Sequence, residues 1–129
     1  MVAQAVAEAP LECCGLLAGS IPPAASEWRV EVHYPLVNTA ASPTEFESDA
    51  KSMFAAWRDM HRRGLDVLAV YHSHPTSPPA PSRKDRDRNY SEQVVNLIIS
   101  LQSAEPEMRG WWLTATEYRQ AAWELTADA

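Results

Sequence analysis

Cysteine is nearly absent from this chain of 129 residues, which contains two, Cys13 and Cys14, side by side. A disulfide between neighbouring residues would be strained and there is no third cysteine to pair with, so a disulfide scaffold is excluded. The Cys-x-x-Cys pair of zinc deaminases and the His-Glu-x-x-His motif of zincins are also missing, which excludes both of these enzyme classes. The two cysteines are either metal ligands or, more simply, small buried residues beside Gly15.

Positive charge and long apolar segments are scarce as well. The chain has 11 basic and 17 acidic residues, a net charge of −6 and a pI near 5.1, which argues against nucleic acid or an anionic membrane as its main partner. No apolar run approaches ~20 residues, and the start, Met1 to Gln4, lacks a charged n-region, so we expect neither a membrane span nor a signal peptide. The expected location is the cytoplasm, and the expected partner is a protein or a small molecule.

The composition itself is ordinary for a globular domain. Hydrophobic residues make up 46% and charged residues 22%, proportions that are typical of a soluble folded protein rather than a disordered one. A length of 129 residues is enough to bury one core but not two. We therefore expect a single domain over residues 1–129.

The most informative stretch runs from Val67 to Asp85. Its apolar start, Val67 to Tyr71, is typical of a short buried strand, and His72 and His74 follow where we expect that strand to end. Because the two histidines are two residues apart, their side chains project to the same side of an extended backbone. Two neutral imidazoles on one side supply half of the ligands of a zinc site.

A proline-rich loop, residues 75–81, connects the histidines to Ser82 and Asp85. Prolines fix φ and stiffen such a loop. Ser82 is a good helix N-cap, and Asp85 falls at position N3, where a carboxylate is favoured by the positive end of the helix dipole. If the stiff loop turns back, Asp85 becomes a third ligand beside His72 and His74, with one coordination position left open for water.

Each part of this pattern has a simpler interpretation by itself. A lone His-x-His at a strand end is usually a surface feature, and a lone Ser-x-x-Asp is usually a capping box. Together, as His-x-His-x(7)-Ser-x-x-Asp with Pro75 after the second histidine, the parts are far more specific. The combined pattern resembles the JAMM motif of the MPN+ zinc metalloproteases, a family that includes deubiquitinating isopeptidases and bacterial sulfur-carrier peptidases.

The resemblance implies one more residue, an upstream glutamate that acts as the base. Glu12 matches it, since Glu12-Cys13-Cys14-Gly15 is similar to the family's segment of a glutamate followed by x-Cys-Gly. By itself, Glu12 would be interpreted as a solvated acid at a helix end. In the family the cysteine before the glycine, here Cys14, lies close to the site without binding the metal.

The family's mechanism implies a role for each residue of the motif. His72, His74 and Asp85 would bind Zn²⁺, which lowers the pKa of its bound water to about 7. Glu12 would take the proton of this water and return it to the leaving amine. Ser82 would stabilise the developing oxyanion or hold the water.

Hydrophobic patterns, caps and turns predict the remaining elements. We expect helices over residues 2–8, 48–63 and 83–89 and strands over 15–19, 27–37, 67–71, 94–101, 108–114 and 119–125. Ser48 is the expected N-cap of the second helix and Gly64 its stop, and His33 is expected at the surface. Two sets of large side chains are expected in the core: Met53, Phe54, Trp57 and Met60 of the second helix, and Trp111, Trp112 and Trp123 of the last hairpin.

This order of elements predicts an α/β fold with a curved mixed β-sheet sandwiched by helices. The resemblance, which runs from Leu11 to about Leu101, implies the same architecture, the MPN/JAB fold related to that of cytidine deaminases. Related domains usually carry a strand before the first helix, and we expect it to be absent here. Two departures favour a minimal prokaryotic type: Ala69-Val70 replaces a common Gly-Trp, and the chain is too short for the insertions with which eukaryotic members bind ubiquitin chains.

The resemblance implies a zinc metallopeptidase that hydrolyses an amide bond at the C-terminal glycine of a small ubiquitin-like sulfur carrier, releasing cysteine or an extension peptide. The carrier's tail would lie extended in a narrow cleft that admits only small residues. Two alternatives remain open: a non-catalytic MPN interaction scaffold, which would lack ligands, and a deubiquitinase-like isopeptidase acting on other ubiquitin-like conjugates. The oligomeric state does not follow from the sequence.

Overall fold

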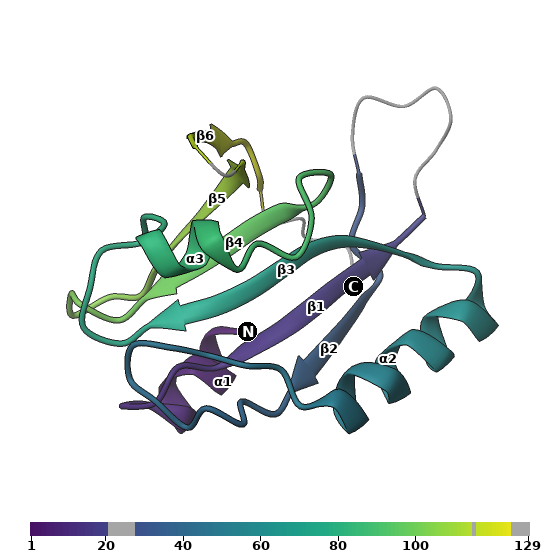
Figure 1. The fold of residues 1–129 in the computed structure, drawn as a ribbon, viewed down its shortest axis with the longest axis horizontal. Helices are drawn as coiled ribbons and strands as arrows, with labels where there is room; N and C mark the ends of the chain where they lie inside the picture. The colour runs from purple at the N-terminus through teal and green to yellow at the C-terminus, as the bar shows by residue number, and fades with distance from the viewer. Residues whose placement is uncertain (21–27, 115, 125–129) are drawn as a thin grey trace.

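The computed structural model of the protein describes residues 1–20, 28–114 and 116–124. Three helices and six strands make up this part of the chain (Figure 1). In order, the elements are α1 (Val2–Glu8), β1 (Cys14–Gly19), β2 (Val32–Leu36), α2 (Ala50–Arg63), β3 (Asp66–His74), α3 (Arg83–Asp87), β4 (Val95–Ser100), β5 (Glu107–Leu113) and β6 (Tyr118–Ala121). No helix in these ranges is long and apolar enough to cross a membrane.

The strands form one mixed sheet in the order β2-β1-β3-β4-β5-β6. All neighbours are antiparallel except β3 and β4, which are parallel. A parallel pair requires a crossover connection, and here that connection contains the proline-rich loop and α3, so α3 is held against the sheet beside the end of β3 (Figure 1). The predicted α/β class with a mixed sheet and helices is confirmed.

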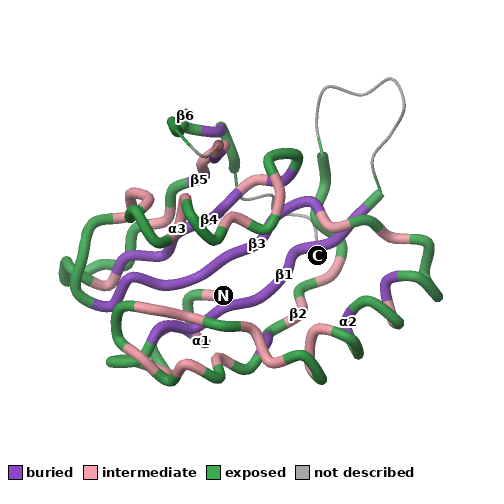
Figure 2. The backbone as a smooth tube through the Cα atoms, viewed as in Figure 1, coloured by how far each residue is buried: buried purple, intermediate pink, exposed green. Residues whose placement is uncertain are grey.

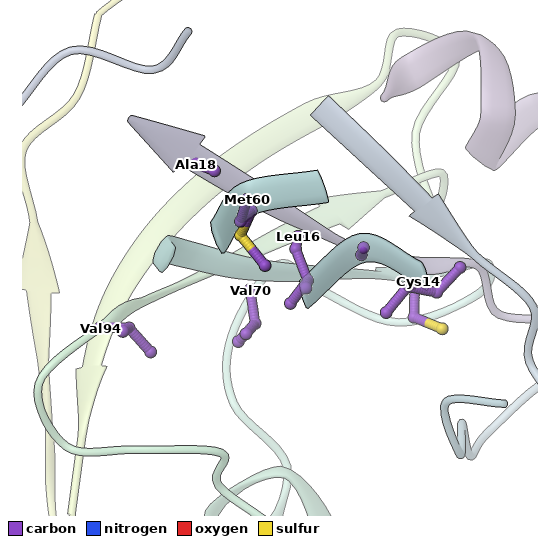
Figure 3. Packing of buried hydrophobic residues seen from close by; sticks show 8 residues of the cluster. Cys14, Leu16, Ala18, Met60, Val70 and Val94 are labelled. Atoms are coloured by element: carbon purple, nitrogen blue, oxygen red, sulfur yellow. The ribbon is translucent and has the colours of Figure 1, made fainter. Parts of the chain in front are cut away.

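The sheet buries side chains on both of its faces. On one face, strand residues such as Cys14, Leu16 and Val70 pack with Ala56 and Met60 of α2 (Figure 3). On the other face, residues that alternate with these along the strands pack around Ala5 of α1: Cys13, Leu17, Ala69, Tyr71, Leu97 and Ile99. The central strands β1, β3 and β4 are therefore almost wholly buried, whereas α2 is mostly exposed (Figure 2).

The N-cap of helix α2 lies one residue later than predicted. Its N-cap is Asp49, whose carboxylate accepts a hydrogen bond from the Ser52 amide at 3.0 Å. The predicted cap, Ser48, is instead held in an isolated β-bridge with Asn38, so its backbone is committed to the preceding loop. The predicted stop is observed: Gly64 adopts the left-handed conformation, with φ of 67°, at the end of the helix.

The prediction that one apolar stripe of α2 packs in the core is partly wrong. Met60 is buried and Met53 packs against the core. Phe54 and Trp57, in contrast, are 59% and 45% exposed. Helix α2 therefore packs on the sheet through fewer side chains than predicted, and its two aromatic residues lie outside this contact.

Other boundaries also differ from those expected. The predicted strand 27–37 is observed only from Val32 to Leu36, and Glu27 lies outside the described residues. The final hairpin is shorter than expected: β6 ends at Ala121, and Trp123, expected in the core, is 42% exposed. His33 is exposed, as predicted.

Candidate active site

The two histidines of the motif lie within β3, not after it as predicted. The strand continues past Tyr71 because β4 pairs with it in parallel to the last residue, with His72 opposite Ile98 and His74 opposite Ser100. Both imidazoles therefore project from the same face of a central strand. His72 and His74 are only 1% and 4% exposed, so the pair is buried in the molecule.

Asp85 is brought to the histidines by the start of α3. The Ser82 hydroxyl accepts a hydrogen bond from the Asp85 amide at 3.1 Å, and an Asp85 carboxylate oxygen accepts one from the Ser82 amide at 2.9 Å. This capping box fixes the carboxylate at the helix start. Its Oδ1 then lies 3.1 Å from His72 Nε2 and its Oδ2 lies 3.1 Å from His74 Nε2.

The three side chains converge in the manner of a metal site. Donor atoms of His72, His74 and Asp85 all lie within 4.8 Å of one another, and the two Nε2 atoms are 3.1 Å apart. Two nitrogens at about 2.1 Å from a tetrahedral zinc are roughly 3.4 Å apart, so the observed separation needs little adjustment to hold that ion. Two imidazoles and one carboxylate are also the ligand types that zinc prefers in catalytic sites. The residues present therefore fit zinc.

The electrostatics of the cluster favour a charged carboxylate. Burial opposes ionisation of Asp85, but the hydrogen bonds with His72 and His74 hold its pKa well below the usual range. Burial likewise lowers the pKa of His74, yet the hydrogen bonds to Asp85 and to the Pro78 carbonyl more than offset this and raise it. A negative charge therefore persists beside two imidazoles in a buried place, which is the charge balance that a cation would complete.

Glu12 lies just before β1 and is 4% exposed. Its backbone is tied to the loop between β2 and α2, because the Glu12 amide donates to the Ser42 carbonyl at 2.8 Å and the Glu12 carbonyl accepts from the Asn38 side chain at 2.9 Å. Burial raises the pKa of Glu12 to about 7 against the opposing effect of His74, and the Asp85 carboxylate adds to the increase. Its Oε1 has no hydrogen-bond partner among the described residues.

Glu12 is close enough to sense the charges of the cluster but is not a member of the three-residue group. Ser82 is exposed, and its hydroxyl oxygen caps α3, which leaves the hydroxyl hydrogen available to a ligand. Cys14 lies on the wall of the same cavity as His72 and outside the group. Burial raises the pKa of Cys14 to about 11, so it is a neutral thiol rather than a ligand-ready thiolate.

The site opens into a cavity of about 420 Å³. The loop before α2 and helix α3 face each other across it and are joined by an ion pair, with Lys84 Nζ 2.9 Å from Glu45 Oε1. Phe46, in the same loop, stacks on His72 with ring centroids 4.7 Å apart and an interplanar angle of 23°. Sequence reasoning missed Phe46 because it lies in a polar loop without periodicity, and no local signal distinguishes it.

The mixed sheet, the paired histidines on its central strand and the carboxylate at the start of the crossover helix are the features expected of a JAB/MPN domain. A comparison with family models confirms this class: the model described as prokaryotic homologs of the JAB domain, Prok-JAB, matches residues 1–114. The chain belongs to that family. The resemblance to the bacterial type of JAMM/MPN+ domain is therefore confirmed.

Individual relatives are similar over much of the chain. A desampylase of Haloferax volcanii is 34% identical over 118 residues, which cover 90% of this chain and 79% of the relative. A CysO-cysteine peptidase of Mycobacterium tuberculosis is 39% identical over 85 residues, 66% of this chain and 56% of the relative. A solution structure of a protein from Desulfitobacterium hafniense superposes with a TM-score of 0.82 at 32% identity, covering 94% of this chain and 82% of that one. The names of these two relatives support hydrolase activity in this family.

Proposed function

We propose that this protein is a zinc metallopeptidase that cleaves an amide bond at the C-terminus of a small ubiquitin-like protein of the sulfur-carrier type. The observation that carries the proposal is the convergence of His72, His74 and Asp85 at mutual distances of 3.1 Å beside Glu12, a buried carboxylic acid with an unpartnered oxygen. Structural polar groups in protein interiors are normally satisfied. A buried cluster that is left incomplete is better explained by a bound ion and a reacting molecule.

His72 and His74 would hold the zinc through their Nε2 atoms and Asp85 through its carboxylate. When bound, zinc supplies a Lewis acid that lowers the pKa of water to near 7. Glu12 is suited to hold and move the proton, because a carboxyl group whose pKa lies near 7 accepts and returns a proton with comparable ease at neutral pH. Its Oε1 would accept the proton from water and then deliver it to the departing amine.

Ser82 would donate its hydroxyl hydrogen to the oxygen of the scissile carbonyl as negative charge develops there. Its oxygen already accepts from the Asp85 amide, which holds the oxygen in place and leaves the hydrogen free to turn toward that carbonyl. Phe46 covers one face of the His72 ring, and would exclude water from that side of the site. These residues orient and shield the reaction rather than exchange protons.

The proposed substrate class rests on the relatives. Those reported above are named desampylase and CysO-cysteine peptidase, and a further one is named a probable TtuB-protein conjugate cleaving protease. The last two names each describe cleavage of a bond to a named partner, CysO or TtuB, which favours the tail of a small protein as the substrate here. The cytoplasmic location and the single-domain organisation expected from the sequence remain predictions.

The alternative of a non-catalytic scaffold is disfavoured by the completeness of the site. A scaffold has no reason to retain three convergent ligands together with a buried acid, and here His72, His74, Asp85, Ser82 and Glu12 are all present. A deubiquitinase-like isopeptidase would use the same residues, so only a substrate comparison separates it from the proposal.

The test is to incubate the zinc-loaded protein with a sulfur carrier extended by cysteine and, separately, with a linked diubiquitin, following each by intact mass. We expect release of cysteine from the carrier and little cleavage of diubiquitin. Cleavage of diubiquitin with the carrier untouched would reverse this ranking. Cleavage of neither by protein shown to hold one zinc per chain would contradict the proposed substrate class.

A further inference from the structure

Three successive carbonyls of the proline-rich loop, those of Ser77, Pro78 and Pro79, are each held by a side chain from a different strand. Ser100 of β4 donates its hydroxyl to Ser77 O at 2.6 Å, and His74 of β3 approaches Pro78 O through Nδ1 at 2.8 Å. The third carbonyl, Pro79 O, accepts a hydrogen bond from the indole nitrogen of Trp111 of β5 at 2.8 Å. The loop is therefore held to three neighbouring strands of the sheet. Of the three side chains that hold it, only His74 belongs to the motif.

The middle contact fixes the state of His74. A carbonyl oxygen only accepts hydrogen bonds, so Nδ1 must carry the hydrogen and, in the neutral ring, Nε2 must present its lone pair. That Nε2 atom is the one that faces Asp85 and His72. The hydrogen bond to Pro78 O thus orients the His74 ring, so that Nε2 is the atom directed at the metal position.

Pro78 O has one further contact, a hydrogen bond that it accepts from the Ala80 amide at 2.8 Å. Because Ala80 belongs to the same loop, this bond shapes the turn but does not tie it to the sheet. The carbonyls on either side are the ones held by Ser100 and Trp111. Trp111 is in turn packed edge-on against Tyr118 of β6, with centroids 5.3 Å apart, and Tyr118 lies under the guanidinium of Arg86 at 5.8 Å. Since Arg86 follows Asp85 on α3, the same hairpin also contacts the helix that carries the third ligand.

We propose that Trp111 and Ser100 are positioning residues: by holding Pro79 O and Ser77 O, they keep Pro78 O where it accepts the hydrogen of His74 Nδ1, which orients the ring with Nε2 directed at the metal position. The consequence for zinc rests on the proposed function. The hydrogen bond from Nδ1 to Pro78 O is a property of the chain and can be measured whether or not zinc binds.

Trp111→Phe removes the indole N–H but retains an aromatic ring for Tyr118, and Trp112→Phe is a matched control. Trp112 is the next residue of β5, so its indole projects from the opposite face, where it packs on Trp28 with centroids 5.9 Å apart. Both variants lose the same atoms from the same strand. They differ in whether the lost N–H held the loop.

Zinc affinity, measured by competition with a chromogenic chelator, is the first readout. Loss of a group that orients a ligating histidine typically weakens metal binding by about tenfold or more, so we expect about a tenfold weaker affinity in Trp111→Phe and no change in Trp112→Phe. Equal affinities of the wild type and Trp111→Phe would overturn the inference. Equal weakening in both variants would assign the effect to general loss of stability and would overturn it as well.

The second readout is the ¹⁵N chemical shifts of His74 in the full chain without metal. We expect the wild type and Trp112→Phe to show a protonated Nδ1 in a hydrogen bond to Pro78 O, and Trp111→Phe to show a weakened or partly lost Nδ1 hydrogen bond. An unchanged Nδ1 signal in Trp111→Phe contradicts the inference even if the wild type fails to bind zinc, an outcome that would instead refute the proposed function. Should Trp111→Phe not fold, Ser100→Ala decides: it releases Ser77 O and must change the Nδ1 signal in the same direction.

Discussion

Successive residues of β3 point alternately into two buried polar clusters, one on the side of the sheet that faces α1 and one on the side that faces α3. The two clusters differ in whether the protein itself completes their hydrogen bonds. Tyr71 and Ser73 face α1, whereas His72 and His74 face α3. On the α1 side, the Tyr71 hydroxyl is bonded to Gln4 and His33, and the Ser73 hydroxyl accepts from the Cys13 amide at 2.8 Å. These groups satisfy one another.

The cluster on the α3 side is not satisfied by the protein itself. Glu12 Oε1 and His72 Nδ1 have no partner among the described residues, and the two Nε2 atoms point at each other across 3.1 Å. A buried polar group without a partner destabilises the fold by about 1–3 kcal/mol. Burial of polar groups therefore does not by itself mark a site. The polar groups on the α1 side complete one another's hydrogen bonds, whereas those on the α3 side leave positions that a bound ion could fill.

Removal of Asp85 is expected to have the largest effect on the cluster that faces α3. Asp85→Ala deletes one of three ligands and leaves two imidazoles with no carboxylate to balance the ion, so we expect the variant to lose its tightly bound zinc and all peptidase activity. Metal analysis of the purified protein measures this directly, with Asp87→Ala on the exposed side of the same helix as the control. Full zinc content in Asp85→Ala would remove Asp85 from the ligand set.

Glu12→Gln separates chemistry from metal binding. The amide has nearly the shape of the acid but cannot accept the proton, so kcat should fall by about two to four orders of magnitude while one zinc per chain is retained. The measurement is a kinetic assay paired with metal analysis of the same sample. Release of zinc by this variant would show that Glu12 is a ligand and that its assignment as the base is wrong.

Four residues of the candidate site were predictable because each belongs to a local pattern, whereas Glu12 was singled out only by the family resemblance. His72 and His74 are related by the strand repeat, and Ser82 and Asp85 by the geometry of a helix start. Phe46 and Trp111 carry no such pattern: Phe46 contacts His72 from a loop, and Trp111 reaches a carbonyl 32 residues away in sequence. These contacts depend on the order of the strands in the sheet, which the hydrophobic periodicity of the sequence does not determine.

The same limit explains the errors in the fold. Helix and strand types were predicted correctly, but the end of β3 depends on its partner β4, which extends the ladder to His74. The side of α2 that is buried depends on how the helix lies on the sheet, so Phe54 and Trp57 were wrongly predicted to be core residues. Local propensity predicts elements, and tertiary contacts decide their limits and their buried faces.

A smaller effect is expected in the pH dependence of the unfolding free energy of the metal-free protein, to which Glu12 on the α3 side contributes. Glu12 has a pKa of 4.5 when unfolded and about 7 when folded, so the folded state binds its proton more tightly and stability falls as pH rises from about 4.5 to 7. A difference of this size corresponds to an upper limit of about 3 kcal/mol. In chelator-treated protein, denaturant unfolding should show this loss for the wild type relative to Glu12→Gln. Parallel pH profiles for the two proteins would contradict a buried, uncompensated carboxyl group.

The smallest effect is expected from a substitution on the α1 side of the sheet, where the hydrogen bonds are complete. Tyr71→Phe removes the hydroxyl that joins Gln4 of α1 to His33 of β2, and both partners can turn to water at the edge of the fold, so we expect a loss of about 1–2 kcal/mol in unfolding free energy. Tyr118→Phe, which removes an exposed hydroxyl, should change little. Zinc content and kcat should be unchanged in Tyr71→Phe, because its side chain lies on the opposite face of β3 from the ligands. Loss of zinc without loss of stability would mean that the two faces of this strand are coupled, and that the α1 cluster helps to place His72 rather than only to hold the sheet.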